Sequence, residues 1–232
     1  MKRRKFIQNT GALGAGLLVS KLSFASEFQE FPTVRVAAAK RHFTSVAVEN
    51  AIKTFQAKVA DKELGWLFEN CFPNTLDTTV TYSLKNGRPD TYVITGDIDA
   101  MWMRDSSAQV WPYLQFANEE QKIKDLIAGV INRQTQYILK DPYANAFYND
   151  PTKIGEWKND KTEMKPGVHE RKWEVDSLCY PIRLAYHYWK KTNDKSPFDN
   201  DWKKAIALVL KTFKEQQRKE GKGPYRFQRE SL

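Results

Sequence analysis

Cysteine, histidine and long apolar runs are scarce in this 232-residue sequence, and each shortage excludes a class of protein. The 2 cysteines form no Cys-x-x-Cys pair for zinc or redox chemistry and are too few for a disulfide scaffold. No apolar run approaches the roughly 20 residues of a spanning helix, which excludes a multi-pass membrane protein. The histidines His42, His169 and His187 lack the spacing of metal ligands, so we expect no metal and no cofactor.

Several enzyme signatures are absent too, although the composition is that of a folded domain. The sequence has no G-x-S-x-G element and no P-loop. Its 41% hydrophobic and 13% aromatic residues exclude a disordered chain and allow a sizeable core. We expect Cys71 and Cys179 to be small buried residues, and most of the seven tryptophans to lie in the core.

The net charge of +9 is concentrated at the N-terminus. Residues 1–25 contain five basic residues and no acid, whereas the remaining 207 residues carry a net charge of +4 with both signs mixed. This balance is typical of a solvated surface, so we expect no nucleic-acid partner.

Residues 1–25 have the pattern of an export signal. The pair Arg3-Arg4 precedes a weakly apolar, glycine-containing stretch, and small residues at 23 and 25 fit a signal-peptidase site. We therefore predict a twin-arginine-type signal peptide, with the twin-arginine export machinery as a partner and a periplasmic or otherwise exported bacterial protein. An ordinary secretory signal and an uncleaved anchor are the alternatives.

The rest of the chain is predicted to be mostly helical. Residues 26–44 are interpreted as a linker or irregular segment, and residues 141–170 as a long binding loop or lid. Two β-like runs, 78–84 and 90–95, flank Asn86-Gly87 and predict a hairpin. Helical periodicity or capping residues predict the remaining elements, which are helices over 45–59, 62–69, 105 or 106 to 114, 119–139, 173–189 and 202–213.

The densest group of polar residues lies at a junction between a strand-like run and a helix. It contains Asp97, Asp99, Trp102, Arg104 and Asp105. Carboxylates accept hydrogen bonds from paired sugar hydroxyls, a guanidinium donates in a fixed fork, and an indole packs on sugar C–H groups. The structural alternative makes Asp97 and Asp99 turn residues, Asp105 an N-cap and Trp102 a core residue.

A second polar cluster spans residues 170–177. Trp173, Asp176 and Tyr180 share one face of the helix predicted over 173–189, an arrangement suited to the lining of a cleft. The alternative is a capped helix start with acids favourably placed near its N-terminus.

Three stretches together resemble the metal-independent exo-α-mannosidases of glycoside hydrolase family 125. They are TGDIDAMWMRDSSAQVWPYL (95–114), ERKWEVDSLCYPIRLAYHYW (170–189) and GPYRFQRES (223–231). The resemblance covers roughly Val36 onward and keeps the family's order. The element Trp102-x-Arg104-Asp105-Ser106 also resembles one in glucoamylase-like α/α barrels.

The resemblance implies an (α/α)6 barrel and the release of terminal α-1,6-linked mannose from a glycan, with inversion and without a metal. Residues 45–232 would form an incomplete N-terminal half of the barrel with a small β-hairpin. Carried over by motif, the sugar subsite would be lined by Asp97, Trp102, Arg104 and Asp105. Its supporting wall would contain Glu170, Arg171, Lys172 and Asp176.

The resemblance also implies that catalytic groups are missing. Family members carry the general acid in a Ser-Asp-Asp element after the Tyr-Arg-Phe-Gln-Arg segment, and the general base later still. Neither has a counterpart up to Leu232, so we expect the catalytic residues beyond Leu232 and interpret the chain as an N-terminal fragment.

Two other hypotheses stay open. The chain could be an exported, non-catalytic protein that binds mannose or a related glycan. Alternatively, Asp97, Asp99 or Asp176 could form an acid–base pair in a complete small enzyme.

Overall fold

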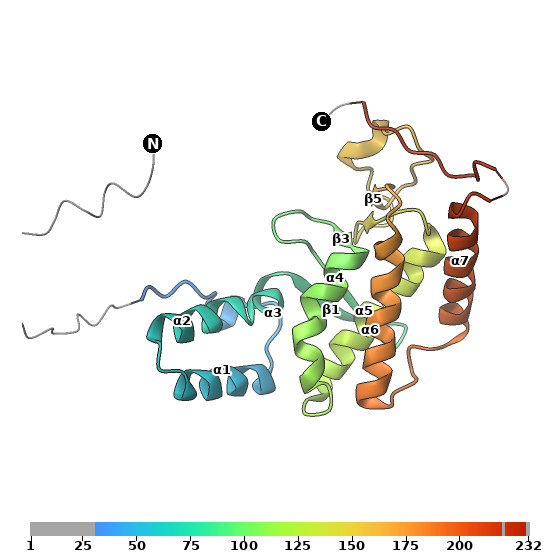
Figure 1. Ribbon diagram of the computed structural model, residues 1–232. Helices are drawn as coiled ribbons and strands as arrows, with labels where there is room; N and C mark the ends of the chain where they lie inside the picture. Colours follow the sequence, from blue (N-terminus) through green and yellow to red (C-terminus); the bar gives the residue numbers. More distant parts are fainter. Residues whose placement is uncertain (1–30, 220, 231–232) are drawn as a thin grey trace, which may run out of the picture. The chain divides into compact units, whose positions relative to one another are not determined.

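The computed structural model describes residues 31–219 and 221–230. The chain divides between Pro32 and Thr33 into two units, and the elements below belong to the second. The predicted signal peptide, residues 1–25, lies outside the described residues, as does the start of the predicted 26–44 linker. The described part is mostly helical with two small sheets, which confirms the mostly helical character that the sequence predicted (Figure 1).

Three helices come first: α1 (Val46–Lys58), α2 (Lys62–Cys71) and α3 (Asn74–Thr78). The side chains of Ser45 and Asp61 cap α1 and α2 by accepting hydrogen bonds from backbone N–H groups. The predicted helices over 45–59 and 62–69 are therefore confirmed.

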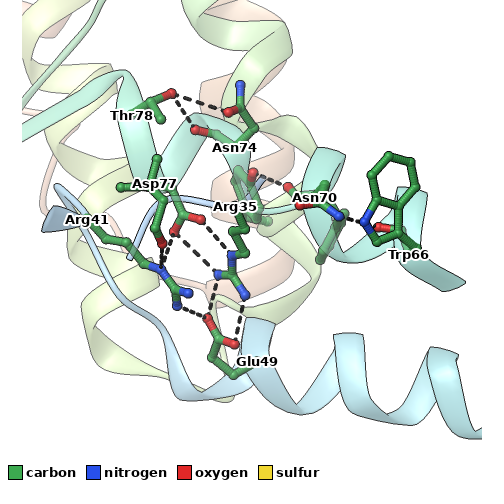
Figure 2. A network of polar contacts seen from close by, with 11 residues as sticks. Arg35, Arg41, Glu49, Trp66, Asn70, Asn74, Asp77 and Thr78 are labelled. Atoms are coloured by element: carbon green, nitrogen blue, oxygen red, sulfur yellow. Dashed lines mark hydrogen bonds and ion pairs between the residues drawn. The ribbon is translucent and has the colours of Figure 1, made fainter. Parts of the chain in front are cut away.

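A buried ion-pair network joins this part of the chain (Figure 2). The Arg35 guanidinium donates to Asp77 through Nε (2.7 Å) and to Glu49 through Nη2 (2.6 Å). Arg41 contacts the same two carboxylates, at 3.1 Å from Glu49 and 3.6 Å from Asp77. Paired carboxylates and guanidinium groups satisfy one another here, which lets Asp77 lie almost fully out of water.

The predicted hairpin is confirmed as β1 (Val80–Lys85) and β2 (Arg88–Val93). Asn86 and Gly87 form its turn with φ values of 51° and 74°. A two-residue turn of type I′ needs positive φ angles at both of these positions. Strand β2 lies against α5 (Gln121–Lys140), and Gly129 allows this close approach. A Cβ atom at Gly129 would lie 2.3 Å from the Thr91 hydroxyl and 2.9 Å from its backbone nitrogen.

Four helices form the larger part of the core: α4 (Met103–Val110), α5, α6 (Val175–Thr192) and α7 (Asn200–Gln216). Helix α5 packs against both α6 and α7, and α6 packs against α4 (Figure 1). The stripe Ile123, Leu126, Ile127, Val130, Ile131 and Ile138 that predicted α5 is fully buried. A 3-10 helix, Trp111–Phe116, follows α4.

A second sheet was not predicted. Strands β3 (Met101–Trp102), β4 (Ala146–Phe147) and β5 (Val168–Glu170) form it in that order, with antiparallel pairing. The predicted long loop over 141–170 therefore contains two strands, together with a 3-10 helix at Glu156–Asn159.

Three smaller expectations are wrong. Helix α4 begins at Met103 rather than at a cap formed by Asp105 or Ser106, and its N-cap residue, Trp102, makes no side-chain cap. Cys71 and Cys179 are exposed free thiols, not buried residues. None of the seven tryptophans is fully buried, since each keeps part of its large indole at the surface.

Candidate functional site

The second sheet brings the two polar clusters of the sequence together. Trp102 of β3 pairs with Ala146 of β4, and Ala146 pairs in turn with Glu170 of β5. The backbone N–H of Met103, the first residue of α4, donates to the carbonyl of Asn145 at 2.9 Å. Trp102 and Glu170, about seventy positions apart in the chain, thus lie in one small sheet next to the start of α4.

Arg104 lies between two carboxylates at this end. It donates to Asp176 of α6 through Nη1 (3.0 Å), and its Nε lies 3.4 Å from Oδ2 of Asp105. We call these three residues the Arg104 cluster. All three are partly exposed, with 42% of the Arg104 side chain and 38% of the Asp176 side chain accessible to solvent. The hydrogen bond to Asp176 raises the pKa of Arg104 above its ordinary value, so the guanidinium stays charged.

A buried amide of α5 holds the first turn of α4 through hydrogen bonds. Gln134 of α5 is fully buried, and its Nε2 lies within hydrogen-bond distance of the Met103 carbonyl (3.1 Å), Ser106 (3.0 Å) and Ser107 (2.8 Å). Because an amide nitrogen carries two protons, the three acceptors share them. This support fixes the backbone that carries Arg104 and Asp105.

Trp102, two residues before Arg104 in the chain, is half-buried. Its indole meets the His169 ring edge-on, with the centroids 4.9 Å apart, and His169 also contacts the Tyr148 hydroxyl at 2.7 Å. Burial lowers the pKa of His169, while Glu156 and Glu170 oppose this shift. A neutral histidine therefore supports the indole near neutral pH.

Glu170 and Arg171 lie in a buried network behind this surface. Glu170 accepts from Asn145 at 2.6 Å and from Arg229 at 2.8 Å. Arg171 donates to Asp141 at 2.8 Å and lies over the ring of Tyr143. These two predicted residues therefore shape the wall from within rather than facing solvent.

The 221–230 segment covers part of this network. The Tyr225 ring stacks on Tyr143 at 4.9 Å, and its hydroxyl accepts from the Trp173 backbone N–H at 2.7 Å. Arg229 makes a two-pronged bond to Asp160, at 2.8 and 2.6 Å. The bonds to Asp160 and Glu170 raise the pKa of Arg229. Burial, reinforced by a bond to Glu215, raises the pKa of Tyr143 to about 12.

The predicted site residues thus fall into two groups. The structure brings Trp102, Arg104, Asp105, Asp176, Glu170 and Arg171 together in the arrangement described above. Asp97 lies in an exposed turn at Thr95–Ile98, and Lys172 is exposed and lies 3.7 Å from Glu174.

One detail of the predicted site is wrong. Trp173 precedes α6, which begins at Val175, so the predicted shared helical face of Trp173, Asp176 and Tyr180 does not exist. Asp99, the remaining acid of the first polar group, is exposed and forms an ion pair with Lys153 at 2.8 Å.

Sequence reasoning missed several residues of the network. They are Asp141, Tyr143, Asn145, Asp160, His169, Tyr225 and Arg229. Five of them lie in the predicted loop 141–170 or on its strands. The stretch Tyr143–Phe147 has two aromatic residues around a central asparagine, and this pattern was a local sign of ordered structure within the loop.

Other properties of the described residues bear on the chemistry. Within residues 31–219 and 221–230, no group of three His, Cys, Asp or Glu side chains could hold a metal ion. Every helix in these ranges falls short of the length or apolarity that crossing a bilayer requires. Cavities of about 350 Å³ beside Arg88 and about 740 Å³ beside Trp111 include none of the predicted site residues. We therefore locate the site by its convergent polar groups.

Known proteins resemble this chain over most of its length. The family model for metal-independent α-mannosidases (GH125) matches residues 61–232. The meiotically up-regulated gene 157 protein of Schizosaccharomyces pombe is 37% identical over 193 residues, which are 80% of this chain and 38% of that protein.

A solved structure is also similar. It is a metal-independent α-mannosidase from Streptococcus pneumoniae in a non-productive substrate complex with α-1,6-mannobiose. The identity is 40% and the TM-score is 0.74, and the match covers 82% of this chain and 44% of that one. The chain thus spans about two fifths of the length of these relatives.

Proposed function

The chain belongs to the metal-independent α-mannosidase family GH125, and from this premise we propose that it acts on glycans that end in α-1,6-linked mannose. The Streptococcus pneumoniae relative, solved with α-1,6-mannobiose, supports this substrate class. We further propose that the helices α4 to α7 are part of an (α/α)6 barrel.

The Arg104 cluster is the observation that carries this proposal. Arg104 is held between Asp105 and Asp176 and keeps two fifths of its side chain in solvent. A pyranose ring offers neighbouring hydroxyl groups, which donate to a carboxylate and accept from a guanidinium. Trp102, two residues before Arg104, adds a partly exposed apolar ring for the sugar C–H groups. The cluster can therefore bind the terminal mannose, while the buried Glu170 network keeps its backbone in place.

The proposed reaction is hydrolysis with inversion and without a metal. Inversion requires a general acid at the leaving oxygen and a general base at a water molecule, with carboxyl groups about 6.5–9.5 Å apart. We assign the Arg104 cluster to holding the sugar. We assign none of the residues in 31–219 and 221–230 to proton transfer.

A second candidate function is mannose binding without turnover. It is favoured by the Arg104 cluster itself, which offers hydrogen-bonding groups for a mannosyl ring without a group that we assign to proton transfer.

One experiment separates the two functions. The full chain is mixed with α-1,6-mannobiose, the heat of binding is measured, and the anomeric protons are followed by NMR. Hydrolysis with inversion releases β-mannose first and is unchanged by EDTA, whereas pure binding gives heat without product. A folded protein that gives neither heat nor product contradicts both.

We also propose that residues 1–25 direct export through the twin-arginine pathway. Replacing both arginines, Arg3→Lys with Arg4→Lys, should leave the protein inside a bacterial host, and Lys2→Ala with Lys5→Ala is the control. Continued export of the double-arginine variant would contradict the proposal.

A further inference from the structure

We propose that Asn145 is a positioning residue that sets the spacing between Arg104 and Asp176, the two halves of the sugar-binding cluster. The inference rests on the proposed function, because it concerns the geometry of that same site. Asn145 is 1% exposed and contacts no solvent-facing group of the cluster directly.

Asn145 uses both its backbone and its side chain to join three segments. Its carbonyl accepts from the N–H of Met103 at 2.9 Å, and its own N–H donates to the Glu170 carbonyl at 3.2 Å. In the side chain, Nδ2 donates to the Glu170 carboxylate at 2.6 Å, and Oδ1 accepts from the N–H of Lys172 at 3.2 Å.

These bonds end next to the two halves of the cluster. Met103 is the first residue of α4 and directly precedes Arg104. Lys172 lies on the short segment that enters α6, whose second residue is Asp176. A shift of the chain at Asn145 therefore changes the position of Arg104 relative to Asp176.

The partner of Asn145 is itself held in place. The other Glu170 oxygen, Oε1, accepts from Arg229 at 2.8 Å, and Arg229 is anchored in turn by Asp160. Glu170 therefore cannot turn to follow a shortened or altered side chain at position 145. The position requires one donor and one acceptor on a short planar group, which an asparagine side chain provides.

This requirement predicts a pH-dependent defect. Asn145→Asp places a carboxylate against the Glu170 carboxylate, and two such groups are compatible only when they share a proton. Binding of α-1,6-mannobiose by this variant should be at least tenfold weaker than wild type at pH 8 and recover at pH 5. Asn145→Ala should be weaker at both pH values.

A double variant that exchanges the amide at position 145 and the carboxylate at position 170 tests the same bond. It keeps one amide and one carboxylate at the contact. In Asn145→Asp with Glu170→Gln, the new carboxylate accepts from the new amide, and the amide oxygen still accepts from Arg229. Binding at pH 8 should return to within about threefold of wild type, a factor that corresponds to less than one hydrogen bond. If the single variant Asn145→Asp is unfolded at pH 8, binding by the double variant still tests the bond between positions 145 and 170.

Asn132 provides the matched control. Its Nδ2 donates to the Pro89 carbonyl at 2.8 Å, and its Oδ1 accepts from Arg88 at 3.0 Å, so its side chain also makes one bond as a donor and one as an acceptor, with no carboxylate partner. Asn132→Asp should bind α-1,6-mannobiose like wild type at both pH values.

Hydrogen exchange provides a measurement that does not depend on sugar. The amides of Met103 and Lys172 should lose protection in Asn145→Ala and keep it in Asn132→Ala. If wild type binds no mannobiose, the proposed function fails, and the exchange result alone decides the role of Asn145. Unchanged protection in Asn145→Ala, or wild-type binding by Asn145→Asp at pH 8, overturns the inference.

Discussion

Two arginine–carboxylate clusters in this chain have similar chemistry and opposite surroundings. Arg35 and Asp77 lie in the N-terminal network with only 8% and 4% of their side chains exposed. Arg104 and Asp176 make a bond of comparable length with 42% and 38% exposed. In the first cluster Nε, Nη1 and Nη2 of Arg35 all donate to carboxylates. The Arg104 guanidinium donates to Asp176 through Nη1, and its side chain stays partly exposed to solvent.

The difference separates a structural ion pair from a binding group. A buried charge without its partner is costly, so a residue such as Asp77 is needed for folding. An exposed pair contributes little to stability because water competes for both groups. Such a pair can instead form hydrogen bonds with sugar hydroxyl groups, which replace water without breaking the protein's internal bonds.

Removing the buried carboxylate should give the largest loss of stability. Asp77→Ala leaves Arg35 without its buried partner, and we expect the free energy of unfolding to fall by about 3–5 kcal/mol. Urea denaturation measures this loss. Glu49→Gln, at the more exposed edge of the network, should cost less. A loss below about 1 kcal/mol for Asp77→Ala would place the two clusters in the same class.

Removing Arg229 should have an intermediate effect. Arg229→Met loses the bonds to Asp160 and Glu170, and charged hydrogen bonds of this kind contribute about 1.5–3 kcal/mol. The 221–230 segment should become more sensitive to proteolysis while α5 stays protected. The control is Arg226→Met, which changes an exposed residue of the same segment. Equal proteolysis of the two variants would contradict this role.

His169 should give a smaller, pH-dependent effect. Burial lowers its pKa in the folded state, so the folded protein binds fewer protons than the unfolded chain below the ordinary value near 6.5. Stability is therefore complete above pH 6.5 and falls as the pH drops toward the folded pKa, by at most about 1.4 kcal/mol per pH unit.

Denaturation at several pH values measures this contribution. His169→Gln should show a flatter curve between pH 7 and 5 than wild type. His187→Gln, which changes an exposed histidine, should keep the wild-type slope. An unchanged slope in His169→Gln would contradict the assignment.

Sequence patterns predicted the helices and strands that are determined by residues close together in the chain. A periodic apolar stripe indicated α5, and Asn86-Gly87 indicated the hairpin, because these features depend on neighbours within a few residues. Strands β3, β4 and β5 have two or three residues each, which is too short for an alternating pattern. The start of α4 was missed because Trp102 carries no capping side chain.

The site was predictable in its residue types but not in its geometry. Arg104, Asp105 and Asp176 were identified from chemistry and from a family resemblance, yet nothing local in the sequence joins α4 to α6. Their meeting depends on pairings across β4, and Asn145 at its edge lies in a stretch that we predicted to be a loop. The exposed cysteines were mispredicted because residue type alone does not say which helical face is covered.

The Arg104 cluster should show the smallest effect on folding and the largest on binding. Arg104→Met keeps the length of the side chain and removes the charge, and we expect less than about 1 kcal/mol of change in stability. The cluster would then be functional rather than structural, the reverse of the Arg35 network.

The most direct test is a calorimetric titration of wild type and Arg104→Met with α-1,6-mannobiose, at equal folded fractions verified by circular dichroism. We predict measurable heat for the wild type and at least a tenfold weaker affinity for the variant, with the unfolding curve nearly unchanged. Equal affinity of the two proteins for the disaccharide would contradict the assignment of this cluster to sugar binding.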